Sequence, residues 1–468
     1  MIDDAIGFRL ELEKLNPHWL TGMPEEEAKY PSHRDELEAL YADRKVKKIS
    51  VVTGPRRAGK TVLLRHLIAR LIEDGVNPRS LLYCSLDNSR LAAMSKDLVR
   101  DVIEFWLEGI AADGSKYVLL DEVHLLDGWY SGVKNFHDLN KDVKMYISGS
   151  ASLAIQVKAE QYLRGRYLVH EIWPLDFRGY LSLRGAGRDG SAKGTRVGPV
   201  EKGPPDDTIS ADRQLHAFAR DFKRYLLVGG FPESREMEDT AKWFEVLENF
   251  VAQKAIYTDI AATFNIRAVK VLDSVLHHVV QNQSRLLTYE SINEVAGLKH
   301  EVLLDYIEYL KGSYLIVEVR KLAPTVKEQL KSRKKFLCVD QGLRNALLAE
   351  YEMSEDNEGF VAENVVGMHL FLAAARSKRQ VFYWKENGEI DFVIKGREPL
   401  LVEVKYKNRV AESEISKVRD AMDATGARLA YIVSKRDFSV MKERGRELRI
   451  VPAAVFCRWV GEYLSAPE

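Results

Sequence analysis

The chain has 468 residues, of which 46% are hydrophobic and 29% are charged, a composition typical of a globular protein with room for two to four domains. Its 69 basic and 69 acidic side chains cancel, so any surface for nucleic acid or a membrane would have to be local. No apolar run approaches the ~18 residues of a membrane span, and the amino terminus lacks signal-peptide features. The widely separated Cys84, Cys338 and Cys457 favour buried thiols in a reducing cytoplasm over a disulfide framework.

Residues 1–45 are acidic and polar, and they predict a helical lead-in that packs on the domain after it. Residues 46–210 alternate β-branched apolar runs with helical patterns, which predicts an α/β domain with a parallel sheet. Strands are expected at 48–53, 80–87, 116–120 and 143–148. Near the end of this domain, residues 185–207 are rich in Gly, Pro, Lys and Asp and predict a long loop.

The stretch Gly54–Thr61 fits G-x-x-x-x-G-K-[ST], the phosphate-binding loop of nucleoside triphosphatases. A predicted strand precedes it and a predicted helix at 62–72 follows it, so backbone N–H groups and the helix N-terminus would face the phosphates. Lys60 can reach the β- and γ-phosphates, and the Thr61 hydroxyl can hold Mg²⁺. A glycine turn that fits by chance is the alternative. The expected nucleotide contacts are Gly54, Pro55, Arg56, Arg57, Ala58, Gly59, Lys60, Thr61 and Val62.

Two acidic residues, Asp121 and Glu122, end the predicted strand that starts at 116. Ligands of an open parallel sheet bind at the carboxyl ends of its strands, so these acids would lie beside the phosphate loop. Asp121 is suited to hold Mg²⁺, and Glu122 is suited to polarise the attacking water. A surface Asp-Glu pair is the alternative, and the phosphate loop earlier in the chain argues against it.

A third strand, at 143–148, also ends in small polar residues. Ser148 or Ser150 could sense the γ-phosphate by hydrogen bonding. A plain turn after the strand explains the same residues equally well.

Residues 211–340 predict a helical lid followed by a winged-helix segment. Two short helices separated by Gly297, and then a strand pair, are typical of a helix-turn-helix with a β-wing. The helices are expected at 289–296 and 300–311, and the strands at 314–319 and 335–339.

The same segment holds a local excess of positive charge. Eight basic residues stand against two acids between Lys311 and Lys335, a balance suited to a DNA phosphate backbone. A solvated wing that only joins domains is the alternative. The expected nucleic-acid contacts are Lys331, Arg333, Lys334 and Lys335.

Residues 341–468 predict an α/β domain with a second candidate site. Asp391, Glu403 and Lys405 follow the D-x(11)-E-x-K spacing that marks the PD-(D/E)xK nuclease fold. Side chains alternate along a strand, so Glu403 and Lys405 face the same way, and Asp391 joins them if the two strands pair. Such a group can hold Mg²⁺ on Asp391 and Glu403 for phosphodiester cleavage. Glu363, on a predicted helix, is a candidate fourth member; a charge row on an exposed sheet face is the alternative.

These motifs, in this order, resemble a large archaeal and bacterial family of AAA-type ATPases with a carboxyl-terminal domain of unknown function. Members of that family look like a nucleotide-binding domain, a winged-helix segment and a nuclease-like domain. The motifs that carry the resemblance are Gly54–Thr61, Leu120–His124, Gly128–Trp129, Ser148–Ser150, Leu163–Arg166, Ile172–Phe177, Gly229–Pro232, Glu363–Asn364 and Glu389–Asp391.

The resemblance implies ATP hydrolysis with Mg²⁺, with Lys60 and Glu122 in catalytic roles. It also implies that Arg164 or Arg166 stabilises transition-state charge, either within one chain or toward a neighbouring subunit of a homo-oligomer. Alternatively, these arginines pair with nearby acids such as Glu160 and Glu171. The loop after Phe177 is longer than the family pattern, so we expect the partner or DNA at that face to differ from the family's.

The interpretation is therefore an ATPase coupled to DNA binding or processing. The first alternative is a nucleotide-dependent protein-binding switch whose nuclease-like domain is inactive. The second is a signalling nucleotidase that never touches DNA.

Overall fold

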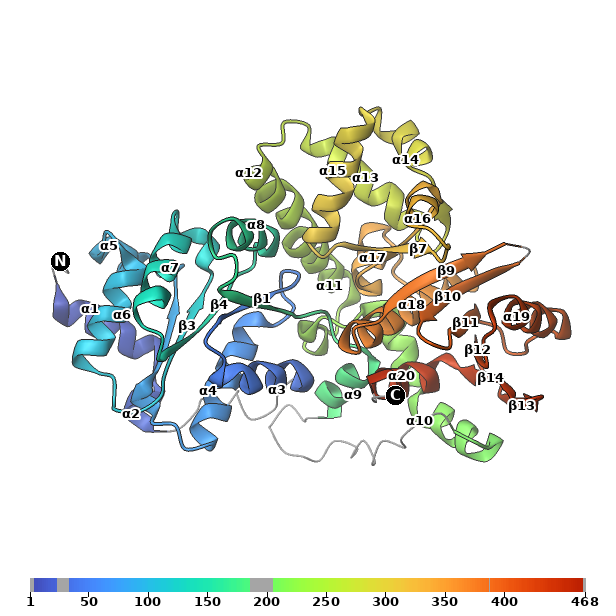
Figure 1. The fold of residues 1–468 in the computed structure, drawn as a ribbon, viewed down its shortest axis with the longest axis horizontal. Helices are drawn as coiled ribbons and strands as arrows, with labels where there is room; N and C mark the ends of the chain where they lie inside the picture. Colours follow the sequence, from blue (N-terminus) through green and yellow to red (C-terminus); the bar gives the residue numbers. More distant parts are fainter. Residues whose placement is uncertain (1–3, 23–32, 186–204, 387, 466–468) are drawn as a thin grey trace. The chain divides into compact units, whose positions relative to one another are not determined.

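A computed structural model describes residues 4–22, 33–185, 205–386 and 388–465 (Figure 1). The chain forms two compact units, the first made of residues 1–173 with 257–266, and the second of 174–256 with 267–468. The predicted division into four parts stays a prediction. Most of the expected loop at 185–207 lies outside the described residues.

The first unit is built on a five-stranded sheet in which all neighbouring strands are parallel, in the order β2-β3-β4-β1-β5. The predicted parallel α/β sheet is confirmed. Its strands are β1 (Ile49–Thr53), β2 (Leu81–Ser85), β3 (Lys116–Asp121), β4 (Val143–Ser148) and β5 (Tyr167–Glu171).

Helices cover both faces of this sheet, because alternate side chains of each strand are apolar on either side. On β1, Ile49 and Val51 belong to one core cluster and Val52 to the other. The first cluster takes residues from α1 (Ala5–Leu15), α2 (His18–Thr21), α5 (Ser89–Met94), α6 (Leu98–Gly109), α7 (Trp129–Leu139) and α8 (Ser152–Tyr162). The second takes residues from α3 (Arg34–Ala42) and α4 (Lys60–Glu73).

The second unit begins with helices, as the pattern over 212–285 predicts. One of them, η6, is a π-helix over Glu248–Ile260, and its last residues belong to the first unit. The others up to the second sheet are α9 (Phe177–Gly185), α10 (Thr208–Val228), η5 (Pro232–Arg235), α11 (Thr240–Leu247) and α13 (Val269–Gln281), with α12 (Ala261–Phe264) in the first unit.

A nine-stranded mixed sheet, in the order β13-β14-β12-β11-β10-β9-β7-β8-β6, organises the rest of the second unit. Its strands are β6 (Leu286–Leu287), β7 (Ile316–Lys321), β8 (Lys334–Cys338), β9 (Gln380–Lys385), β10 (Glu389–Lys395), β11 (Leu400–Lys405), β12 (Leu429–Ser434), β13 (Ser439–Glu443) and β14 (Arg446–Pro452). The helices are α14 (Tyr289–Ala296), α15 (His300–Gly312), α16 (Val326–Lys331), α17 (Gln341–Leu347), α18 (Glu358–Arg376), α19 (Glu412–Thr425) and α20 (Ala453–Ser465).

The elements expected for the winged-helix segment form, although the assignment itself stays a prediction. Gly297 ends α14 with φ +62°, and β7 pairs antiparallel with β8. These strands are not a free hairpin: α16 lies between them in the chain, and β7 continues into the carboxyl-terminal strands through a parallel pairing of Arg320 and Lys321 with β9. Among the described residues, no helix is long and apolar enough to cross a membrane.

Candidate functional site

The phosphate loop lies between β1 and α4, and two glycines shape it. Gly54 has φ +148°, and a Cβ there would lie 1.9 Å from the carbonyl oxygen of Ile172, so only glycine fits. Gly59 has φ +97° and directly precedes Lys60, the first residue of α4. The loop therefore ends at a helix N-terminus, which favours a bound anion.

Ser152, which the sequence does not single out, holds the start of the loop. The Gly54 N–H donates to Ser152 Oγ at 2.8 Å, and the Ser152 hydroxyl donates to the Gly54 carbonyl at 2.5 Å. Because Ser152 is the first residue of α8, this helix fixes the strand-to-loop turn through a pair of hydrogen bonds.

Lys60 is buried, with 6% of its surface exposed, and its ammonium donates to the carbonyls of Gly54 at 2.9 Å and Pro55 at 2.7 Å. Burial lowers its pKa to about 8, against the opposing effect of Glu122 and Asp121. Its direct partners are thus neutral carbonyls. An ammonium in this state gains more from a phosphate oxygen than from the groups it leaves.

Asp121 lies at the carboxyl end of β3 and binds Thr61, as the magnesium prediction requires. The Thr61 hydroxyl donates to Asp121 Oδ2 at 2.6 Å, and Tyr83 donates to the same oxygen at 3.1 Å. Oδ1 accepts from the Ser148 hydroxyl and from the Glu122 N–H. The hydroxyl and carboxylate together fit a Mg²⁺ ion that also binds a nucleotide, because Mg²⁺ prefers oxygen ligands and shares them with phosphates.

Glu122 follows Asp121 in a left-handed conformation with φ +52°. Its Oε2 accepts from the Ser150 N–H at 2.9 Å and from the Ser150 hydroxyl at 3.0 Å. His124 Nδ1 is 3.3 Å from the same oxygen, and burial lowers the pKa of His124. In this structure Ser148 therefore binds Asp121, and Ser150 binds Glu122.

Arg56 on the phosphate loop forms a bidentate ion pair that the sequence does not predict. Its Nε donates to Asp259 Oδ2 at 2.7 Å and its Nη2 to Oδ1 at 2.6 Å. The Asp259 side chain is 8% exposed, and its charge is felt at both Lys60 and His124. The Asp259 carboxylate, from η6, is thus bound to a guanidinium of the phosphate loop, where phosphates are expected.

The two candidate arginine fingers lie away from this loop. The Arg166 carbonyl accepts from Ile49 N–H at the start of β1, whereas the loop follows the end of β1, about 16 Å along a strand of this length. Arg166 pairs with Asp138 at 2.8 Å, and Arg164 is exposed. Arg166 thus lies near the amino end of β1, and the phosphate loop follows its carboxyl end, which argues against the predicted role within one chain. The role toward a neighbouring subunit stays a prediction.

Comparisons with known proteins agree with this geometry. Residues 46–181 match the family model of an AAA domain. The chain contains an AAA-type P-loop ATPase domain, of which residues 46–173 lie in the first unit. We call residues 46–181 the ATPase domain below. Residues 219–354 and 358–455 match two further models, each described as a domain of unknown function (DUF8612 and DUF4143).

Two relatives that match most of the chain are described as uncharacterized proteins. A Methanocaldococcus jannaschii protein is 26% identical over 77% of this chain and 75% of its own. A Haemophilus influenzae protein is 23% identical over 80% of this chain and 87% of its own. Among solved structures, a Walker-type ATPase of Pyrococcus abyssi is 15% identical, covers 70% of this chain and 98% of its own, and has a TM-score of 0.42. That likeness adds nothing to the assignment.

Outside the ATPase domain, the four residues of the predicted nuclease-like site come together. β10 and β11 pair antiparallel with Phe392 opposite Val402, which sets Asp391 opposite Glu403. The Asp391 N–H donates to Glu403 Oε2 at 3.1 Å, and Lys405 Nζ is 2.5 Å from Glu403 Oε1. Glu363 joins them through a fifth residue, Lys335, whose Nζ is 2.9 Å from Glu363 Oε1 and 3.0 Å from Asp391 Oδ1.

Three local features place these side chains. Asn364 binds the backbone of Cys338 through two 2.9 Å hydrogen bonds, which docks α18 on β8. A Cβ on Gly367 would lie 2.5 Å from Phe392, so glycine lets α18 approach the sheet closely. The pairing of β10 with β9 shifts between Ile390 and Val393, and such a bulge redirects a side chain. Burial and the Asp391 charge raise the pKa values of Glu363 and Glu403.

The predicted nucleic-acid contacts divide into two pairs. Lys331 and Arg333 are exposed, but Lys334 and Lys335 are only 2% and 1% exposed. The Lys334 ammonium donates to the carbonyls of Gln329, Leu330 and Ser332 at 2.7–2.8 Å. The prediction is corrected for Lys334 and Lys335, because neither ammonium is available to a phosphate backbone.

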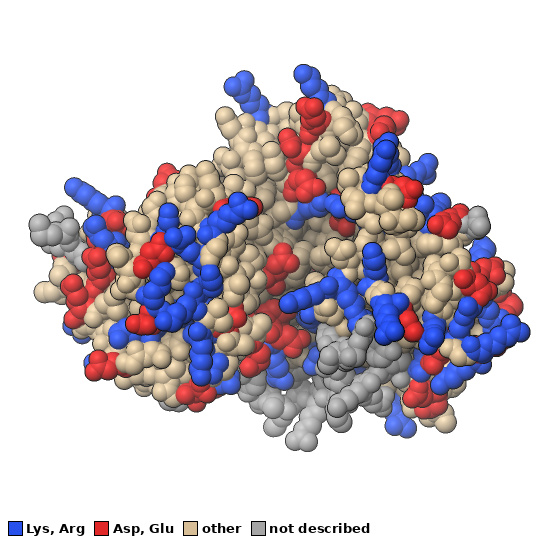
Figure 2. All heavy atoms as spheres, in the orientation of Figure 1, with Lys and Arg blue, Asp and Glu red and all other residues tan. Residues whose placement is uncertain are grey.

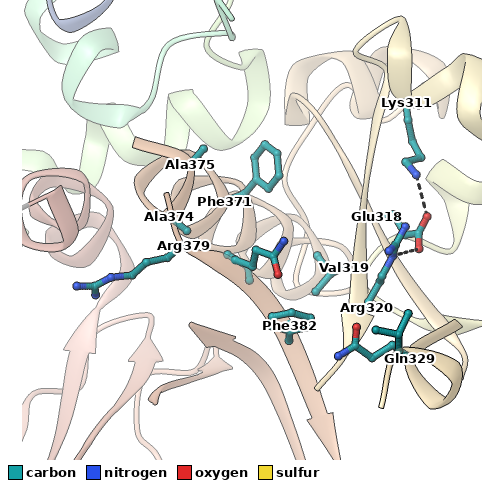
Figure 3. A pocket seen from close by; sticks show the side chains of 13 residues that line it. Lys311, Glu318, Val319, Arg320, Gln329, Phe371, Ala374, Ala375, Arg379 and Phe382 are labelled. Atoms are coloured by element: carbon teal, nitrogen blue, oxygen red, sulfur yellow. Dashed lines mark hydrogen bonds and ion pairs between the residues drawn. The ribbon is translucent and has the colours of Figure 1, made fainter. Parts of the chain in front are cut away.

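A pocket of about 520 Å³ opens beside the join between β7 and β9 (Figure 3). These strands pair only at Arg320 and Lys321, so the space next to this short ladder is lined by α16 and α18. Glu318 on its wall binds Lys311 at 3.0 Å and Arg320 at 2.9 Å, and Phe371 and Phe382 are opposite. The pocket is not part of either candidate site.

Proposed function

We propose that this chain hydrolyses ATP with Mg²⁺ at the phosphate loop of the ATPase domain. One observation carries the proposal: Thr61 and Asp121, sixty positions apart, are joined by a 2.6 Å hydrogen bond at the carboxyl edge of the sheet. Lys60 and Glu122 lie at the same edge. A loop for the phosphates, two oxygen donors for the metal and a carboxylate for water are the parts that this chemistry needs.

In this mechanism the protein positions groups and stabilises charge. Backbone N–H groups and Lys60 hold the β- and γ-phosphates, and Thr61 and Asp121 hold Mg²⁺. The ion, when bound, neutralises charge on the phosphate oxygens. Glu122 orients the attacking water and accepts its proton. In this structure, Ser150 holds Oε2 of the Glu122 carboxylate through two hydrogen bonds, so Glu122 would face the attacking water with its other oxygen, Oε1.

Asp121→Asn tests the proposal, because it keeps the side-chain shape and removes the charge. Phosphate release from Mg-ATP should fall to background in this variant and should remain in Asp127→Asn, a control at an exposed position of the same domain. Equal rates in the wild-type protein and Asp121→Asn would show that this site does not hydrolyse ATP.

A second proposal is that ATP turnover is coupled to DNA. Lys327, Lys331 and Arg333 are exposed around α16, and exposed cations beside a helix-turn-helix-like segment suit a phosphate backbone. The two helices of the same segment, α14 and α15, instead carry exposed acidic residues. These are Glu290, Glu294, Glu301, Asp305 and Glu308. A recognition helix with this charge would repel DNA, so these acids favour the alternative of a protein-binding switch.

Measuring the ATPase rate with single-stranded, duplex and branched DNA distinguishes DNA coupling from the protein-binding switch. Stimulation that falls with salt and is lost in a Lys331→Ala, Arg333→Ala double variant supports DNA coupling. An unchanged rate with every DNA supports the switch. Figure 2 shows basic and acidic side chains interspersed over the visible face, so a DNA contact on that face would be confined to a small area.

Assembly into a homo-oligomer is a third part of the proposal. Arg164 is exposed and lies three residues before Tyr167, which pairs with the first residue of β1, so its charge would serve a neighbouring subunit. Arg164→Ala should lose ATPase activity and should regain part of it when mixed with Lys60→Ala, which keeps the arginine. No recovery on mixing would argue against this role.

A further inference from the structure

The carboxylates of the second unit surround a cation that the chain itself supplies. Lys335 Nζ lies 2.9 Å from Glu363 Oε1 and 3.0 Å from Asp391 Oδ1, between an oxygen of each. We propose that the Lys335 ammonium takes the place of a divalent metal ion in this cluster, so that the carboxyl-terminal domain neither binds Mg²⁺ there nor cleaves DNA. This inference goes beyond ATP hydrolysis and does not depend on it.

The carboxylate oxygens of Asp391 and Glu403 already accept hydrogen bonds within the protein. All four oxygens of Asp391 and Glu403 accept from N–H groups: Asp391 from Lys335 and Val404, and Glu403 from Lys405 and the Asp391 backbone. Lys335 also approaches the Asp391 carbonyl at 3.5 Å. Among the residues that the structure describes, no set of three or more His, Cys, Asp or Glu side chains is arranged to hold a metal ion.

The cluster cannot hold the Lys335 ammonium and a Mg²⁺ ion at the same time, for reasons of charge and of space. Magnesium needs oxygens at about 2.0–2.1 Å in near-octahedral order. An ion within that distance of Glu363 and Asp391 would overlap the Lys335 ammonium or be repelled by it. The ammonium cannot move aside into water, because Lys335 is 1% exposed and its Nζ lies 5.0 Å from the centre of the Phe392 ring.

Lys335 reaches the cluster from a strand outside the predicted nuclease-like part of the chain. It lies on β8, where it pairs with Leu286 of β6 and Val319 of β7. The D-x(11)-E-x-K pattern is intact, and a residue 56 positions before Asp391 occupies the site. The motif can therefore persist in a chain whose metal position is filled.

Counting bound Mn²⁺ by electron paramagnetic resonance tests the proposal on the full chain. The ATPase domain contributes equally to every variant, so differences report on the cluster. Wild-type protein and Asp391→Asn should bind the same number of ions. Lys335→Met should bind about one more ion per chain, and the Lys335→Met, Asp391→Asn double variant should lose it. Lys405→Met is the matched control and should gain none, because Lys335 still separates Glu363 from Asp391.

Three outcomes would overturn the proposal. The first is an Mn²⁺ ion that wild-type protein holds and Asp391→Asn loses. The second is nicking of plasmid DNA by wild-type protein with Mn²⁺ or Mg²⁺ that Asp391→Asn abolishes. The third is a folded Lys335→Met protein that gains no ion. The first two comparisons use only wild-type protein and Asp391→Asn, so they decide the matter even if Lys335→Met does not fold.

Discussion

Two buried lysines define the two candidate sites, and their partners make the sites different. Lys60 in the ATPase domain donates to two loop carbonyls, and burial lowers its pKa to about 8. Lys335 in the second unit binds two carboxylates, and these raise its pKa above the ordinary value in spite of burial. Both lysines are removed from water, but only Lys335 has its charge neutralised by direct contact.

The comparison separates a site that awaits a ligand from one that is complete. A buried ammonium facing neutral carbonyls has lost its hydration without gaining a counter-charge, so an incoming phosphate supplies what is missing. A buried ammonium between carboxylates already has its counter-charge, and the cost of its burial is offset inside the protein. Lysine burial alone therefore does not identify a binding site; the partners of the lysine do.

The largest expected effect is on the stability of the second unit. Lys335→Met leaves the buried Asp391 and the partly buried Glu363 without their cation, and breaking a buried pair of this kind costs about 3–5 kcal/mol of unfolding free energy. Lys405→Met should cost about 1 kcal/mol or less, because that side chain is 30% exposed. Urea unfolding of both variants measures the difference. Equal losses of unfolding free energy would show that Lys335 is no more important to the cluster than Lys405.

The next effect concerns Lys60. Lys60→Met keeps the apolar stem and removes the charge that stabilises the transferring phosphate, so kcat should fall about 10²–10³-fold. Stability should change far less than in Lys335→Met, because no carboxylate loses a direct partner. Steady-state phosphate release and urea unfolding check both halves. A Lys60→Met protein that hydrolyses ATP at the wild-type rate would show that the Lys60 charge is not needed for turnover.

Glu122→Gln should separate binding from turnover. The amide cannot accept a proton from water, so hydrolysis should fall about 10²-fold, while ATP affinity should be unchanged because Lys60 and the loop are intact. Fluorescent nucleotide binding and phosphate release are the measurements. Parental turnover in Glu122→Gln would place the base elsewhere. Ser150→Ala is a useful companion, because it removes the hydroxyl hydrogen bond to Glu122 and keeps both the carboxylate and the bond from the Ser150 backbone N–H.

The smallest effect is expected at Asp259. Its carboxylate holds Arg56 of the phosphate loop and repels a triphosphate, so Asp259→Asn should tighten ATP binding roughly tenfold, equivalent to ~1.4 kcal/mol. Asp142→Asn is the control, because that side chain is fully exposed and pairs only distantly with Lys47. Weaker binding in Asp259→Asn would mean that Asp259 organises the loop instead of competing with the ligand.

The sequence predicts the parts of both sites that lie on neighbouring positions. The phosphate loop, with its flanking strand and helix, is a local pattern. The parallel sheet then brings Asp121 to Thr61, because strands of such a sheet end at one edge. Asp391, Glu403 and Lys405 follow from one hairpin with a side-chain period of two. Local spacing therefore fixes the loop and the hairpin, whereas Thr61 and Asp121, sixty positions apart, meet because β1 and β3 end at the same edge of one parallel sheet.

The contributions that sequence reasoning misses come from distant segments. Ser152 is 98 positions from Gly54, Asp259 is 203 from Arg56, and Lys335 is 56 from Asp391. Only tertiary packing sets these contacts. The basic run ending at Lys335 misleads for a related reason: adjacent residues on β8 point to opposite faces of a sheet that is covered on both sides, so Lys334 and Lys335 are both buried.

The pairing of β7 with β9 has a mechanical consequence. It makes one sheet from strands of the winged-helix-like segment and of the carboxyl-terminal domain, and the contact of Lys335 with Glu363 and Asp391 fastens the same join from inside. The two cannot swing as separate modules without tearing a sheet. Any movement driven by nucleotide would therefore move the winged-helix-like segment and the carboxyl-terminal domain as one rigid body. The hinge of such a movement would lie elsewhere in the chain.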